Sequence, residues 1–318
     1  MPKVIDEESI IKLLWMKLGR SQDPFNDDVA WVSNKSGKNL LVAKSDMLVA
    51  ATDVPRKMSA LQVARKSLVS CASDFASKGV NPSFCIISLG LPKKCANRKF
   101  VTELAHGFAR AQDEYGIRIV GGDTNETSSG IVIDCSIFGF SDHIVKRKGA
   151  RPGDYIGVSG PFGLQPAGLL TLKGKTTSRD LGFNKLAINS VLNPKARLDF
   201  GLNNSRHLSS CTDSSDGLAI SLYHLAESSR VNFVLDKIPI AHGVEKFASE
   251  NKLNPDDLAL FGGEEFELVF TFDPKHSGTL SQSGAITIGK VSKLEKKGEP
   301  RVYYRNKKIS RRGWLHFG

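Results

Sequence analysis

Strand-like and helix-like segments alternate along both halves of this chain, and this alternation limits the fold more than any other feature of the sequence. A long helix begins at Ser59, with Gln62 in the capping-box position, and ends at Gly79. A strand is expected next at 84–89, followed by a helix at 99–114. Because alternating segments of this kind build layers of helices on sheets, we expect an α/β (α+β) protein.

The remaining expected elements divide between the two halves of the chain. The first half should contain a helix near 10–18 and strands at 29–32, 40–43, 117–120 and 131–140. The second half should contain strands at 155–159, 231–235, 268–272, 286–288 and 301–304, and helices at 165–172, 194–203 and 218–228. A basic segment with Gly and Pro, KRKGARPGD, separates the halves. For 318 residues this predicts two domains, 1–146 and 147–318.

The composition excludes a membrane-spanning protein. No stretch of 18 uncharged apolar residues is present, so no helix is expected to cross a bilayer. The first residues, MPKVIDEESI, reach acidic side chains at once, which is not typical of a secretory or transit peptide. We therefore expect a cytoplasmic protein.

Acidic residues recur in short clusters, mostly at the expected ends of strands and helices. The clusters are Asn26-Asp27-Asp28, Ser45-Asp46, Asp74, Gly121-Gly122-Asp123-Thr124, Asp213-Ser214-Ser215-Asp216-Gly217 and Gly262-Gly263-Glu264-Glu265. Carboxylates from several elements suit Mg²⁺, a hard cation that takes oxygen ligands together with substrate phosphates. Phosphoryl transfer needs this kind of positioning and charge neutralisation. Each cluster alone also has an ordinary explanation, such as a helix N-cap or a turn.

Asp74 is the most informative of these acids because it lies inside a helix. Its helical neighbours Ser67, Ser70, Cys71 and Ser77 form a stripe of small polar side chains against which an ion or a ligand could lie. A buried carboxylate without a partner is costly, so Asp74 implies either a nearby cation or exposure to solvent.

The order and spacing of the clusters resemble those of thiamine-monophosphate kinase, in the superfamily that includes aminoimidazole ribonucleotide synthetase. The matching segments are NDDVA at 26–30, SDMLV at 45–49, SDFASKG at 73–79, VGGDT at 120–124, KGARPGD at 148–154, DSSDGL at 213–218 and GGEEFEL at 262–268. Several matches in the same order along nearly the whole chain are far more specific than any one of them.

The resemblance implies a role for each matching residue. It implies that the metal ligands are Asp27, Ser45, Asp46, Asp74, Asp123, Asp213 and Asp216, of which Asp46, Asp74 and Asp123 would be catalytic. It implies ATP contacts by Gly122, Asp123, Arg147 and Ser215, and contacts to thiamine phosphate by Asp53, Glu264 and Trp314. Trp314 would stack on the thiamine cation, although C-terminal packing is an equally ordinary role for it.

The resemblance also implies the architecture, the cofactor and the partners. The fold would be aminoimidazole ribonucleotide synthetase-like. An N-terminal mixed sheet with helices would bind metal and ATP and form a homodimer, and a C-terminal α/β domain would complete the substrate site. ATP would be the co-substrate, thiamine phosphate the acceptor and Mg²⁺ the cofactor, with direct in-line transfer of the γ-phosphate. This interpretation requires Asp27, Asp46, Asp74 and Asp123 to converge in the folded chain.

Five positions depart from the family pattern. Asn26 replaces a glycine, Lys44 replaces a hydroxyl residue that would contact metal, and Asp53 replaces a histidine that would contact the substrate. Ala105 stands near the place of a tyrosine beside the adenine, and Glu265 replaces an aspartate. The implied metal ligands of this chain thus match the family pattern more closely than its implied substrate contacts do.

Two other functions remain open on the sequence. The chain could be another ATP-dependent enzyme of the same superfamily, of the kind that activates an amide or formyl group. The net charge of +11, concentrated in part at 290–312 around Tyr303 and Tyr304, could also suit a nucleic-acid-binding protein. We do not expect nucleic acid as a partner, because the acidic clusters would repel its backbone.

Overall fold

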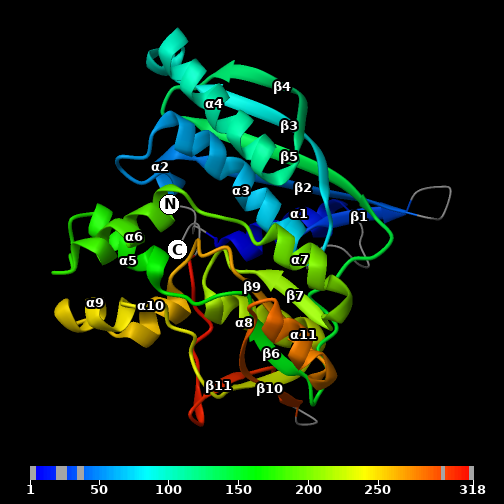
Figure 1. The fold of residues 1–318 in the computed structure, drawn as a ribbon. Helices are drawn as coiled ribbons and strands as arrows, with labels where there is room; N and C mark the ends of the chain where they lie inside the picture. Colours follow the sequence, from blue (N-terminus) through cyan, green and yellow to red (C-terminus); the bar gives the residue numbers. More distant parts are fainter. Residues whose placement is uncertain (1–4, 19–26, 34–38, 295–297, 315–318) are drawn as a thin grey trace.

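The computed structural model describes residues 5–18, 27–33, 39–294 and 298–314, and it shows two β-sheets with helices packed against them (Figure 1). The α/β prediction is therefore confirmed. Asn26 lies outside the described residues. No helix in the described part of the chain is long and apolar enough to cross a membrane.

The first sheet is built from residues 30–141. The elements of this half of the chain are α1 (Glu7–Leu18), which precedes the sheet, and then β1 (Ala30–Ser33), β2 (Leu40–Val49), α2 (Ala50–Asp53), α3 (Ala60–Lys78), β3 (Pro82–Leu91), α4 (Arg98–Tyr115), β4 (Arg118–Glu126) and β5 (Val132–Ser141). The strand order is β1-β2-β5-β3-β4. Only the β3–β4 pair is parallel, so the sheet is mixed, as expected.

The second sheet is built from residues 155–308. Its elements are β6 (Tyr155–Val158), α5 (Leu164–Leu172), α6 (Leu181–Leu192), α7 (Leu198–Asn204), β7 (Ser210–Asp213), α8 (Leu218–Ser229), β8 (Val231–Leu235), α9 (Val244–Glu250), α10 (Pro255–Phe261), β9 (Leu268–Phe272), α11 (Ser277–Gln282), β10 (Ile286–Lys293), β11 (Val302–Tyr304) and β12 (Lys307–Lys308). The strand order is β12-β11-β8-β10-β6-β9-β7. The two sheets fall on either side of the predicted boundary at 146–147, whose exact place stays a prediction.

Helix α3 links the two halves. It contacts β2 and β5 of the first sheet and β7 and β9 of the second, and nearly all of its residues are buried. The capping box predicted at its start is present, because the Ser59 hydroxyl accepts from the Gln62 N–H and Gln62 Oε1 accepts from the Ser59 N–H. Gly79 ends it in the left-handed conformation at φ 65°, as glycine allows. Side chains on α3 are therefore placed where both halves meet.

Two strands of the first sheet are longer than expected. β2 pairs with β5 along its whole length, from Leu40 opposite Ser141 to Val49 opposite Val132. β4 continues to Glu126 beside β3. The clusters that were expected just after these strands, Ser45-Asp46 and Gly121-Gly122-Asp123-Thr124, therefore lie inside them.

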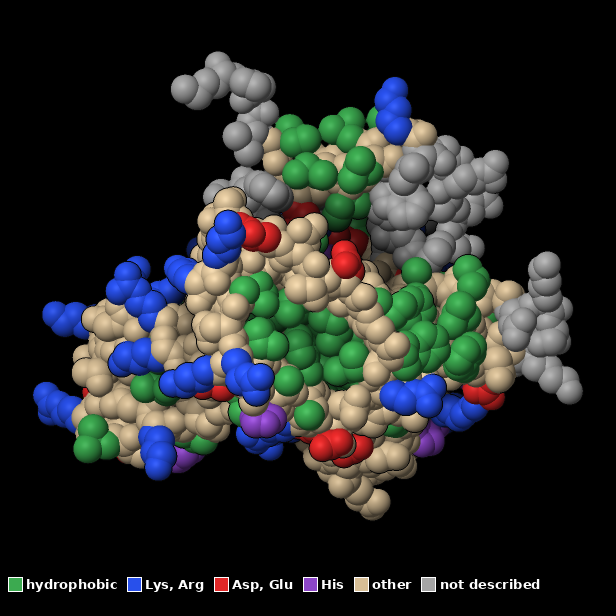
Figure 2. Space-filling model, turned by 90° about the horizontal axis from the view of Figure 1, so that it is seen from above, with side chains coloured by type: hydrophobic (Ala, Val, Ile, Leu, Met, Phe, Trp, Pro, Cys, Tyr) green, Lys and Arg blue, Asp and Glu red, His purple; other side chains and the backbone are tan. Residues whose placement is uncertain are grey.

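The face of the first sheet that points away from α3 carries exposed apolar side chains. Val32, Met47, Ile86 and Phe140 are all more than one-third exposed, whereas the other face packs its side chains against α3. Figure 2 shows hydrophobic side chains gathered on one face of the molecule. Lys and Arg side chains gather on the side where Figure 1 places α5, α6 and α9.

Candidate active site

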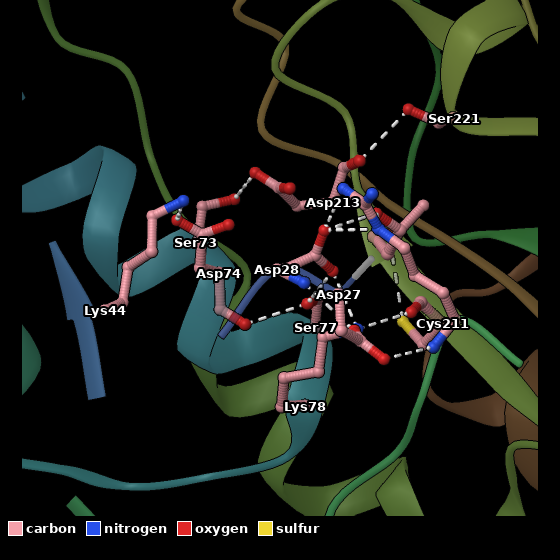
Figure 3. Close-up of polar contacts among 12 residues, drawn as sticks. Asp27, Asp28, Lys44, Ser73, Asp74, Ser77, Lys78, Cys211, Asp213 and Ser221 are labelled. Atoms are coloured by element: carbon pink, nitrogen blue, oxygen red, sulfur yellow. Dashed lines mark hydrogen bonds and ion pairs between the residues drawn. The ribbon is translucent and has the colours of Figure 1, made fainter. Parts of the chain in front are cut away.

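Three buried carboxylates meet where α3 passes between the two sheets. They belong to Asp28 before β1, Asp74 on α3 and Asp213 at the end of β7, and each offers an oxygen within 4.8 Å of the others (Figure 3). We call these three residues the acidic cluster. It is the only group of its kind among the described residues. Asp74 is therefore buried with partners rather than exposed on a helix surface.

The small polar residues of α3 hold the other two acids in place. The Ser73 hydroxyl donates to Asp213 Oδ2 at 2.7 Å, and the Ser77 hydroxyl donates to Asp28 Oδ2 at 2.9 Å. Thr212 on β7 donates to Asp28 Oδ1 at 2.9 Å. Ser77, which belongs to the polar stripe predicted on α3, thus orients a carboxylate of another element, and Ser73, which was not part of that prediction, orients a second.

Three basic side chains surround the acidic cluster. Lys78 Nζ lies 2.7 Å from Asp28 Oδ2 and 2.5 Å from Asp27 Oδ1, and it donates to the Cys211 carbonyl. The Arg147 guanidinium pairs with Asp28, with its Nε 2.7 Å from Oδ1. On the opposite side, Lys44 Nζ lies 2.9 Å from Asp74 Oδ2. Arg147, expected to contact ATP, is thus held by a carboxylate here.

The three acids of the cluster differ in how easily they ionise. Burial alone would raise the pKa of Asp28, but Arg147 and Lys78 outweigh burial and hold that pKa well below its usual range. Burial raises the pKa of Asp213 to about 7, and the neighbouring Asp28 adds to this. Burial also raises the pKa of Asp74 well above its usual range, because Lys44 only partly offsets burial and the nearby acids. A cation between Asp74 and Asp213 would favour the ionised form of both carboxyls.

Asp27 lies beside the cluster and not in it. Its Oδ1 is bound by Lys78, and its Oδ2 accepts from the backbone N–H of Arg147 at 3.0 Å. Metal binding was predicted for Asp27, whereas the structure brings Asp28 into the three-carboxylate group. Only the local turn decides which of two adjacent acids faces inward, and the sequence does not reveal it.

Neighbouring residues of β2 point to opposite faces of the first sheet. Lys44 and Asp46 face α3, whereas the Ser45 hydroxyl faces away and donates to Asp134 Oδ1 at 2.8 Å. Asp46 therefore approaches the acidic cluster, and the Ser45 side chain does not.

Asp123 lies apart from the other acids within this chain. On β4 it stands opposite Ser88 of β3, which stands opposite Asp134 of β5, so it belongs to the row that faces away from α3. Asp46, on β2, is also separated from Asp123, on β4, by three strand spacings, or about 14 Å. Asp123 and Asp46 are too far apart to share one ion, and the expected convergence of all four acids does not include Asp123.

Gly122 and Asp123 line a shallow pocket between β4 and α4. Ala105, Phe108 and Gln112 of α4 form its other wall. A Cβ on Gly122 would overlap the Ile87 carbonyl, so only glycine allows β4 to approach β3 so closely there. Ala105, the position where a tyrosine was expected, leaves this wall open.

The residues predicted to bind the substrate come together at the other end of α3. Lys66 on α3 donates to the Asp53 carbonyl at 2.6 Å and pairs with Glu264. The Glu264 N–H donates to the Ser215 carbonyl at 2.6 Å, and the Trp314 N–H donates to the Asp216 carbonyl at 3.0 Å. Lys66 was not among the predicted site residues, although it is buried and joins residues of both halves.

The carboxyl of Glu265 predicts a dependence of stability on pH. It accepts the Gly163 N–H at 2.6 Å, and burial raises its pKa from 4.5 to about 8. The folded chain therefore keeps a proton that the unfolded chain loses above pH 4.5, so this group's contribution to stability falls as the pH rises towards 8. Glu265→Gln should be more stable than the wild type by roughly 1–3 kcal/mol at pH 8, and by less at pH 5.

Urea unfolding at the two pH values measures this difference. Glu245→Gln, at an exposed position on α9, serves as the control and should show no gain that grows with pH. An equal Glu265→Gln effect at both pH values would contradict a raised pKa at this carboxyl.

Comparison with known proteins agrees with this geometry. Residues 26–141 match the family described as AIR synthase related protein, N-terminal domain. The thiamine-monophosphate kinase of Nitrosopumilus maritimus is 40% identical over 323 residues, which cover 98% of this chain and 99% of that protein. This chain belongs to the thiamine-monophosphate kinase family. Family membership favours kinase activity over the two other functions that the sequence left open.

Other relatives extend the likeness within the thiamine-monophosphate kinase family. The thiamine-monophosphate kinase of Pyrococcus horikoshii is 36% identical, over 91% of this chain and 90% of that protein. The solved structure of AaThiL complexed with AMPPCP and TMP superposes with a TM-score of 0.87 at 29% identity, covering 98% of this chain and 97% of that one. The whole two-sheet arrangement is therefore shared with the family.

Proposed function

We propose that this chain transfers the γ-phosphate of ATP to the phosphate of thiamine monophosphate, with Mg²⁺ held at the acidic cluster. The observation that carries the proposal is the meeting of Asp28, Asp74 and Asp213 within 4.8 Å of one another, at the junction of both halves. Family membership and the solved relative complexed with AMPPCP and TMP support the choice of reaction.

The donor set fits Mg²⁺. All three side chains offer carboxylate oxygens, the ligands this ion prefers, and no sulfur or imidazole ligand belongs to the group. The hydroxyl of Ser214, next in the chain to Asp213, is buried and has no hydrogen-bond partner among the described residues. Bound at the cluster, Mg²⁺ would neutralise negative charge on the two phosphate groups that must approach each other.

The chain's own residues would orient the reactants. An oxygen of the acceptor phosphate attacks the γ-phosphorus while the bond to the β–γ bridging oxygen breaks, and ADP leaves. No general base is needed, because the acceptor phosphate is already ionised at pH 7. We propose that the pocket beside Gly122 and Asp123 receives the nucleotide, which can extend between β4 and the cluster. Gly122 would then contact the nucleotide from the β4 side, while Asp46 and Asp74 act from the α3 side. Asp123, whose side chain lies on the other face of the sheet, remains a proposed metal and nucleotide ligand.

The acceptor would bind where Asp53, Glu264 and Trp314 are brought together by α3 and the loop at 213–217. Glu264 offers a carboxylate to the thiamine cation, and Trp314, about half exposed, offers an aromatic face. Ser215 and Asp216 in the same loop lie between this region and Asp213, so they can contact the phosphate end of a bound molecule. Ser45 and Asp216 remain proposed metal ligands.

We also propose that two chains pair through the open face of the first sheet. Met47, Ile86 and Phe140 are exposed there, and an apolar sheet face of this kind is typical of a protein–protein contact. A cytoplasmic location stays a prediction.

An assay of the purified protein tests the proposed reaction. With ATP, Mg²⁺ and thiamine monophosphate, we expect thiamine diphosphate and ADP in equal amounts, and no product after removal of divalent ions with EDTA. Release of inorganic phosphate without thiamine diphosphate would contradict the proposal and would favour the amide- or formyl-activating alternative. Full activity in EDTA would contradict the metal assignment alone.

A further inference from the structure

Lys44 is an unusual residue to find beside a proposed metal site. It lies on β2, faces α3, and places its ammonium 2.9 Å from Asp74 Oδ2 (Figure 3). Its side chain is 25% exposed, so the ammonium is largely enclosed. Asp46 follows two residues later on the same face of the strand. The ammonium of Lys44 therefore stands on the side of Asp74 opposite to Asp28 and Asp213.

An ammonium cannot replace a hydroxyl as a metal ligand. Lysine offers three N–H donors and no acceptor, whereas the hydroxyl residue that the family resemblance predicts at this position would offer an oxygen. A fixed positive charge next to Asp74 also repels a second divalent ion there. Where the resemblance predicts a metal contact, this chain holds a cation of its own.

We propose that the Lys44 ammonium takes the place of one divalent ion on the Asp46–Asp74 side of the acidic cluster. This inference rests on the proposed function, because it assumes that the cluster holds divalent ions.

The charges around the site support this exchange. The carboxylates of Asp27, Asp28, Asp46, Asp74 and Asp213 surround the junction, and the cations among them are Lys44, Lys78 and Arg147. With all five carboxylates ionised, as binding of a divalent ion requires, the negative charges exceed the three positive charges by two. One divalent ion balances that excess, and each further ion would leave the site positive before any phosphate arrives. The chain itself should therefore hold a single divalent ion in the absence of nucleotide.

Counting bound Mn²⁺ tests the proposal without relying on activity. Free Mn²⁺ would be measured by electron paramagnetic resonance during titration of the whole protein without nucleotide. We expect one Mn²⁺ per wild-type chain. Lys44→Thr, which restores a hydroxyl, should bind a second Mn²⁺ at least about tenfold more tightly than the wild type does. Lys44→Arg, which keeps the positive charge, should bind the same number of Mn²⁺ ions as the wild type.

Lys275→Met is a matched control, since this exposed lysine pairs with Asp273 far from the cluster and should leave the count at one. Equal Mn²⁺ binding by the wild type and Lys44→Thr would overturn the proposal. Two or more ions in the wild type would overturn it even if Lys44→Thr failed to fold. If the wild type and Lys44→Thr bind equal numbers of Mn²⁺ ions and the wild type forms thiamine diphosphate, only the proposed role of Lys44 is wrong. If the two proteins bind different numbers of ions but the wild type has no kinase activity, only the proposed reaction is wrong.

Discussion

Asp74→Asn should lower kcat by roughly 100- to 1,000-fold, because it removes a carboxylate at the centre of the proposed metal site. Folding should survive. The variant loses the ion pair with Lys44, but it also removes the buried charge and its repulsion by Asp213 and Asp28, which together raise the pKa of Asp74. These two effects oppose each other, so the free energy of unfolding should change by less than about 1 kcal/mol.

Steady-state kinetics at saturating Mg²⁺ and ATP, together with urea unfolding, measure both effects. Asp142→Asn is a suitable control, because Asp142 also pairs with a basic residue, Arg206, but does so on the surface. That control should stay within about twofold of the wild type. An Asp74→Asn variant with near-normal kcat would show that the cluster takes no part in the reaction.

Lys78→Met should cause the largest loss of stability among single substitutions around the site. The Lys78 side chain is fully buried at the end of α3 and pairs with both Asp27 and Asp28. Removing one partner of a buried ion pair leaves uncompensated charge, which typically costs about 3–5 kcal/mol. We expect the free energy of unfolding to fall by that amount at pH 7 without added metal.

A double-mutant cycle separates the ion pair from packing. Asp27→Asn added to Lys78→Met should recover part of the lost stability, because the carboxylate of Asp27, whose ion pair is with Lys78, is then absent, whereas Asp28 keeps its pair with Arg147. Lys275→Met should change stability by less than about 0.5 kcal/mol, since its ion pair is exposed. If Lys78→Met were as stable as the wild type, Lys78 would not be the counter-ion that the structure shows.

The sequence predicted the framework of the site well because local rules decide it. The capping box at Ser59 and Gln62 and the glycine at 79 set both ends of α3, and the helical spacing placed Asp74 on its polar stripe. The loop from Asp213 to Gly217 precedes α8 as expected. Several helices of the second half were missed, among them α6 at Leu181–Leu192, whose mixed composition gives only a weak periodic pattern.

The partners of the site residues could not be predicted because they depend on contacts between distant segments. Lys66 and Lys78 resemble ordinary solvated helix lysines in the sequence, yet α3 is covered by both sheets and buries them. Asp123 was expected to follow a strand, but pairing with β3 extends β4 past it and fixes its side chain on the outer face. Strand length and register are set by the neighbouring strand, which the local sequence does not specify.

The most direct measurement is an anomalous difference map from crystals grown with Mn²⁺ and AMP-PCP. We expect a peak between Asp28, Asp74 and Asp213, within coordination distance of a carboxylate oxygen of each. Bound nucleotide with no peak at these three carboxylates would contradict the proposed metal site.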